Sequence, residues 1–135
     1  MLLVDTNIVA YLLIYGDHTA DAQALRLRDQ DWRSEAFLMV EFTNVLAASV
    51  AAKRLNLALA QRCLLEAGSL LTGKLAHVPH APALATAAQY RVSAYDARFL
   101  TLAQQLGSRL VTEDVKLRAA APALTQSLLE ALARA

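Results

Sequence analysis

The chain has 135 residues, of which 56% are hydrophobic and 19% charged, and its formal net charge is +1. This length and apolar content suit one hydrophobic core, so we expect residues 1–135 to form a single domain. A nearly neutral chain lacks the basic composition typical of nucleic-acid-binding domains, and a single cysteine excludes both an internal disulfide and a thiolate metal cluster.

Two features of the sequence bear on location. No uninterrupted apolar stretch reaches the roughly 18 residues of a membrane span, because even the richest part, residues 36–52, contains Glu41 and Asn44. The start of the chain also lacks the apolar core of a secretory signal, since Asp5 interrupts the first apolar run. We therefore expect a soluble protein in the cytoplasm.

The first half of the chain combines capping residues with apolar runs. In chain order it predicts a strand at residues 1–4, a helix at 8–13, a helix from Thr19 to about 31, and a long helix at 36–53. The long helix is expected because its stretch contains no Gly or Pro and is rich in Ala, Leu and Val. The stretch 32–36 is ambiguous, although Ser34 and Glu35 resemble the entry to that helix.

The second half alternates helices with two short strands. It predicts a helix at 56–71, a strand at 75–78, a helix from Pro82 to about Val92, a helix from Asp96 to Leu106, and a strand at 109–112. Asn56 can cap the first of these helices, and Gly73 and Gly107 can end two of them.

Short apolar strands that alternate with helices indicate an α/β fold. We expect a short, mainly parallel central sheet with helices on both faces. In the tail, residues 123–135, leucines recur every four positions at Leu124, Leu128 and Leu132, which predicts a terminal amphipathic helix. A short edge strand within this tail remains an alternative.

Four acidic residues stand beside apolar runs rather than on charged segments: Asp5, Glu41, Asp96 and Asp114. A carboxylate in such surroundings must be paired, protonated or bound to a cation. If all four converge, oxygen ligands alone favour a hard divalent ion such as Mg²⁺ or Mn²⁺, and they suffice for one or two ions.

Helix capping is the competing explanation for three of these acids. Asp5, Asp96 and Asp114 each lie at a plausible helix start, where Asp is a preferred cap. Two of them, Asp5 and Asp114, also follow expected strands, and ligands of α/β folds bind beyond the carboxyl ends of parallel strands. For these two acids, a helix cap and a metal ligand would occupy the same position after a strand, so position alone does not separate the two explanations.

Glu41 separates the two explanations, because it falls inside the long helix and away from both ends. Its neighbours at helical spacing are the apolar Phe37, Leu38 and Val45, so capping cannot account for it. Asn44, one turn later, suggests a polar notch that faces the helix starts. The hypothesis of a metal site therefore depends chiefly on Glu41.

Four segments together resemble a known family. They are Leu3-Val4-Asp5-Thr6-Asn7-Ile8, Glu41-Phe42-Thr43-Asn44-Val45-Leu46, Tyr95-Asp96-Ala97 and Thr112-Glu113-Asp114. In this order and at these separations the chain resembles a PIN domain, and most closely the VapC-type toxins of bacterial toxin-antitoxin pairs. The resemblance implies a metal-dependent endoribonuclease that a cognate antitoxin neutralises, with the four acids as catalytic and metal-binding residues.

The expected chemistry is hydrolysis of RNA phosphodiester bonds by a metal-activated water. Asn7 and Thr112 are expected to support the site, and Lys116 and Arg98 to contact phosphate. Some relatives carry a further carboxylate just after the fourth acid, which this chain lacks. The three histidines are interpreted as turn or surface residues: His18, His77 and His80.

Other functions find less support in the sequence. A haloacid dehalogenase phosphatase would need a second Asp where Asn7 stands, and a dinucleotide-binding protein would need a Gly-rich turn after the first strand. The alternative left open is a catalytically silent PIN-fold module that binds RNA or protein.

The expected protein partners are an antitoxin helix and a second copy of this chain. Short apolar helices leave room for grooves that contain Leu12, Leu13, Leu57 and Leu64, and ordinary core packing is the competing explanation.

Overall fold

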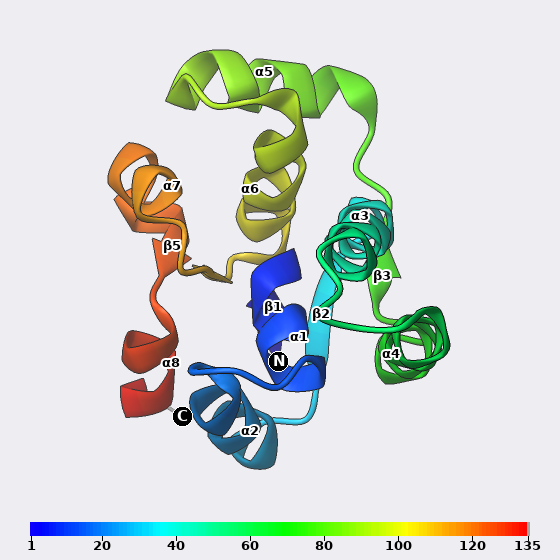
Figure 1. Ribbon diagram of the computed structural model, residues 1–135. Coiled ribbons are helices and arrows are strands. Elements are labelled where there is room, and N and C mark those ends of the chain that lie inside the picture. The colour runs from blue at the N-terminus through cyan, green and yellow to red at the C-terminus, as the bar shows by residue number, and fades with distance from the viewer. Residues whose placement is uncertain (135) are drawn as a thin grey trace.

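The computed structural model describes residues 1–134, and its centre is a sheet of five parallel strands in the order β3-β2-β1-β4-β5 (Figure 1). The strands are β1 (Leu2–Val4), β2 (Trp32–Glu35), β3 (Leu75–Ala76), β4 (Leu110–Val111) and β5 (Thr125–Gln126). Consecutive residues of a strand point to opposite faces, yet Leu3 and Val4 are both fully buried, as are Leu110 and Val111. The sheet is therefore covered on both faces, which is the arrangement expected for a parallel sheet.

Eight α-helices surround this sheet in the part of the chain that the structure describes. They are α1 (Thr6–Leu13), α2 (Thr19–Arg28), α3 (Phe37–Ala51), α4 (Leu57–Leu70), α5 (His80–Tyr90), α6 (Ala94–Leu106), α7 (Val115–Ala120) and α8 (Leu128–Arg134). Helix α1 packs against α2, α3 and α4, and α6 packs against β2 and β4 with α5 beside it (Figure 1). No helix within residues 1–134 is long and apolar enough to cross a membrane.

The predicted α/β class with a parallel sheet is confirmed, and so are several element ends. The Asn56 side chain accepts a hydrogen bond of 2.8 Å from the backbone N–H of Leu59 and caps α4. Gly107 ends α6 in the left-handed conformation, with a φ of 60°, where the absence of a Cβ removes strain.

The expectation of a helix entry at Ser34 and Glu35 is wrong, because both residues belong to strand β2. Two polar side chains of this strand are buried with specific partners: the Ser34 hydroxyl donates to the Val4 carbonyl at 2.6 Å, and Glu35 pairs with Arg98. Such a strand carries no apolar run that would reveal it in the sequence.

Two other boundaries also differ from the prediction. Helix α6 begins at Ala94, before Asp96, because the Ser93 hydroxyl caps it by accepting a hydrogen bond of 3.0 Å from the Asp96 N–H. The terminal helix begins only at Leu128, since Pro122–Leu124 forms a 3₁₀ turn and strand β5 follows. The alternative of a short edge strand in the tail is therefore correct.

Candidate active site

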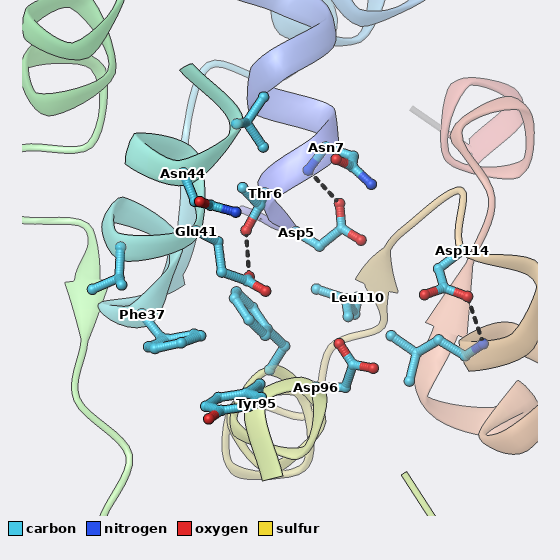
Figure 2. A pocket seen from close by; sticks show the side chains of 14 residues that line it. Asp5, Thr6, Asn7, Phe37, Glu41, Asn44, Tyr95, Asp96, Leu110 and Asp114 are labelled. Atoms are coloured by element: carbon cyan, nitrogen blue, oxygen red, sulfur yellow. Dashed lines mark hydrogen bonds between the residues drawn. The ribbon is translucent and has the colours of Figure 1, made fainter. Parts of the chain in front are cut away.

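All four predicted acids line a single cavity of about 540 Å³ at the carboxyl ends of β1 and β4 (Figure 2). Asp5 directly follows β1, and Asp114 follows β4. Glu41 comes from the second turn of α3 and Asp96 from the first turn of α6. The fold thus brings together residues that are far apart in the sequence, as expected at this end of a parallel sheet.

The Asp5 carboxylate is held on both of its oxygens. Its Oδ1 accepts hydrogen bonds from the backbone N–H groups of Asn7 and Ile8, at 3.1 and 3.3 Å, and so caps α1. Its Oδ2 accepts a short hydrogen bond from the Thr112 hydroxyl. The backbone N–H of Asp5 also donates to the Val111 carbonyl at 3.1 Å, which ties the residue to β4.

Glu41 turns into the cavity, as the proposed metal site requires. It is half-buried, and its Oε1 accepts a hydrogen bond of 2.7 Å from the Thr6 hydroxyl on α1 (Figure 2). Asn44 lines the same cavity one turn later. A glutamate that served only solubility would extend into solvent, so this placement supports a functional role.

The two remaining acids differ in their relation to helix capping. Asp114 caps α7, since its Oδ1 accepts a hydrogen bond of 3.0 Å from the Leu117 N–H. Asp96 does not cap α6, because Ser93 performs that task. The capping explanation considered for Asp96 therefore fails. Thr112 connects two of the acids, since its hydroxyl donates to Asp5 and accepts from the Asp114 N–H at 3.1 Å.

Burial and mutual repulsion raise the pKa of three of the carboxyl groups. Burial raises the pKa of Asp5 from 3.8 to about 7, against its hydrogen bonds, and the charge of Glu41 adds to the rise. Burial also raises the pKa of Glu41, with the charge of Asp96 as a further cause, and raises the pKa of Asp96, where Asp114 contributes. Each acid thus disfavours ionisation of a neighbour, and a cation would relieve this repulsion.

The chemistry of the donor set fits a hard divalent cation, because the four acids supply only oxygen ligands. They line the cavity without closing on one point. Among residues 1–134 no three side chains of His, Cys, Asp or Glu lie close enough together to form a metal centre. The residues that would hold such an ion are Asp5, Glu41, Asp96 and Asp114.

The other predicted site residues lie in different places. Asn7 lines the cavity, and Thr112 lies behind it, fully buried. Lys116 is exposed on α7 and does not line the cavity. The Arg98 guanidinium lies outside the acidic cavity, where its Nε donates to Glu35 at 3.1 Å. Its expected phosphate contact stays a prediction.

Several residues at the site were not predicted from the sequence. Phe37 and Tyr95 stack on each other at the edge of the cavity, with ring centroids 5.2 Å apart and planes 10° apart (Figure 2). Glu35, at the end of β2, is a fully buried carboxylate that Arg98 neutralises. A tyrosine directly before Asp96 was the only available signal for the aromatic pair.

Comparison with known proteins identifies the fold family. The sequence model of the PIN domain matches residues 2–122. The chain is also similar to the crystal structure of PAE2754 from Pyrobaculum aerophilum, with a TM-score of 0.77 and 21% sequence identity over 98% of this chain and 93% of that one. At this identity the likeness shows a common fold. No curated protein matches the chain. PIN domains are generally metal-dependent nucleases. Because the family match covers most of its length, the chain belongs to the PIN domain family.

Proposed function

We propose that the protein is a metal-dependent endoribonuclease of the cytoplasm, the toxin of a type II toxin-antitoxin pair. The observation that carries this proposal is the position of Glu41 inside the acidic cavity. Asp5 and Asp114 also cap helices, but Glu41 has no structural task at a helix end. Its presence beside three further carboxylates supports a site built for a cation.

The side chains around the cavity prepare it for a phosphodiester. Thr112 and the first turn of α1 fix the Asp5 carboxylate, and Thr6 fixes Glu41, so these oxygens are oriented before any ligand arrives. Bound Mg²⁺ or Mn²⁺ would lower the pKa of a water molecule that it holds and would place a positive charge beside the phosphate. We further propose that Asn7 and Lys116 contact the RNA backbone.

The test is cleavage of RNA by the purified protein with Mg²⁺ or Mn²⁺. Cleavage should vanish with chelator and should fall by at least about 100-fold in Asp5→Asn and in Asp96→Asn, since even indirect partners of metal ligands contribute about 10- to 100-fold. Asp17→Asn is the matched control, because Asp17 is an exposed acid outside the cavity.

Equal cleavage by the parent and the two cavity variants would overturn the proposal, since the activity would then come from another site or a contaminant. RNA binding without cleavage under any metal condition would favour the catalytically silent module.

We also propose a cognate antitoxin and a second copy of this chain as protein partners. Helices α3 and α4 border an apolar groove of about 340 Å³ that contains Leu57 and Leu64, whereas Leu12 and Leu13 pack against the core. The groove and the acidic cavity lie along the same helix, α3. An antitoxin helix in this groove would therefore lie beside the site that it must block. Exposed Leu59 and Leu65 on α4 support the homodimer.

A further inference from the structure

A second cavity, of about 450 Å³, lies next to the acidic one. The two cavities share Phe37, Val40 and Tyr95 as a common wall. In Figure 2 the labelled rings of Phe37 and Tyr95 stand at the edge of the acidic cavity, close to Glu41 and Asp96. A chain whose phosphate reached the acids could therefore continue over this wall into the second cavity.

The shared wall is an aromatic surface. Phe37 and Tyr95 stack nearly parallel, and the Tyr95 side chain is 62% exposed although it is large and partly apolar. Phe37 supports it from α3, so the tyrosine ring is held in place. Bases of single-stranded RNA stack on exposed aromatic rings of this kind.

Arg98 organises a second wall of this cavity. Its guanidinium donates to Glu35, which is fully buried, and to the Val78 carbonyl. It also lies 3.3 Å from His80 Nδ1 and 3.4 Å from His77 Nε2. A guanidinium can only donate, so an imidazole nitrogen that accepts from it leaves the other ring nitrogen, Nε2 of His80 or Nδ1 of His77, as the one that can donate.

This wall therefore offers hydrogen-bond donors beside an ion pair. Glu35 compensates the charge of Arg98, and the two imidazoles lie within hydrogen-bond distance of its guanidinium. Because Glu35 already pairs with Arg98, a phosphate would gain less here than from an unpaired arginine. The polar edge of a nucleobase fits it better, since a base presents carbonyl oxygens and ring nitrogens as acceptors and a flat face for stacking.

We propose that the second cavity binds the base of a nucleotide next to the scissile phosphate of single-stranded RNA. The base stacks on Tyr95, and its edge accepts hydrogen bonds from His77 and His80. Arg98 is a positioning residue that fixes both imidazoles. This inference rests on the proposed function for the identity of the substrate, and it adds a site that selects the sequence at which RNA is cut.

The test measures RNA binding with Ca²⁺ in place of Mg²⁺ or Mn²⁺, and electrophoresis confirms that the RNA stays intact, so that the readout does not depend on cleavage. Fluorescence anisotropy would be recorded with labelled oligoadenylate, oligocytidylate and oligouridylate, and with an abasic oligomer that has the same phosphates. Tyr95→Ala should weaken binding of the oligonucleotides by at least about fivefold, the lower bound for loss of one stacked base. Tyr95→Phe should bind like the parent, and the abasic oligomer should bind parent and Tyr95→Ala equally.

The histidines are tested by base preference. The double variant His77→Ala/His80→Ala should bring the affinities for the three oligonucleotides closer together, whereas His18→Ala, remote from the cavity, should leave them unchanged. Thermal melting confirms that each variant folds. All altered side chains are largely exposed, so folding should be retained.

The outcomes separate this inference from the proposed nuclease. If the parent cleaves RNA while the Tyr95 and histidine variants keep its affinity and base preference, the inference is wrong and the nuclease stands. If RNA binding depends on these residues but no metal supports cleavage, the nuclease is wrong and the inference stands. Absence of both binding and cleavage would overturn both.

Discussion

Two acids of the cavity show how one residue type can serve the fold and the site at once. Asp5 caps α1 and Asp114 caps α7, while each also faces the cavity. Their positions could be predicted, because caps and ligands both follow the strands of an α/β fold. The pairing of Glu35 with Arg98 could not, since the two residues lie 63 positions apart and neither belongs to a recognisable motif.

The raised pKa of Asp5 predicts how stability depends on pH. Because its pKa is 3.8 when exposed and about 7 in the fold, protonation stabilises the metal-free protein fully below pH 3.8. This contribution is lost as the pH rises to about 7. We expect Asp5→Asn to keep the helix cap and to be more stable than the parent at pH 8 without metal, by roughly 1–4 kcal/mol.

Thermal denaturation in chelator at pH 5 and pH 8 measures this effect. The gap between parent and Asp5→Asn should be larger at pH 8, and Mn²⁺ should raise the melting temperature of the parent more than that of the variant. If the variant were less stable than the parent at pH 8 in chelator, the ionised Asp5 carboxylate would not destabilise the fold and the prediction would be wrong.

At the scale of elements, long helices and apolar strands were predictable, whereas short polar pieces were not. Strand β2 has the sequence Trp-Arg-Ser-Glu, and its buried polar residues, Ser34 and Glu35, find their partners on β1 and α6. Strand β5 has two residues and lies at the edge of the sheet beside β4. Such elements depend on tertiary contacts, which local propensity and periodicity do not contain.

The start of α6 offers a test of the link between an element and the site. Ser93→Ala removes the cap and should cost about 1 kcal/mol, which is about 3–6 °C in melting temperature for a domain of this size. Because Asp96 lies in the first turn, we also expect slower RNA cleavage. Ser93→Asn is the matched control, since Asn caps helices about as well as Ser. If Ser93→Ala and Ser93→Asn melt at the same temperature as the parent, the capping assignment fails.

At the scale of the whole molecule, the small net charge becomes understandable. If the protein cleaves RNA as proposed, its charge of +1 does not attract the substrate by a general basic field, and its acidic cavity would repel phosphate in the absence of a cation. Recognition of RNA must then come from the bound metal, a few local hydrogen-bond donors and base stacking.

The acidic cavity, the second cavity and the apolar groove all include residues of α3, so this helix links the proposed chemistry, substrate and partner.

The proposed assembly predicts what light scattering will measure. The chain alone should scatter as a homodimer at micromolar concentration, with twice the monomer mass of 14.6 kDa. Co-expression with a cognate antitoxin should yield a larger complex that does not cleave RNA. Leu57→Glu places a charge in the α3–α4 groove and should prevent that complex while leaving the dimer intact, because the Leu57 side chain is 61% exposed and contributes little to the core.

Leu27→Glu is the matched control, since Leu27 is 79% exposed on α2 and lies outside the groove. It should change neither the dimer nor the complex. A strict monomer would exclude the homodimer. If the Leu57→Glu variant still bound the partner and its nuclease activity were still inhibited, the antitoxin would bind another surface. The groove would then be a feature of ordinary core packing.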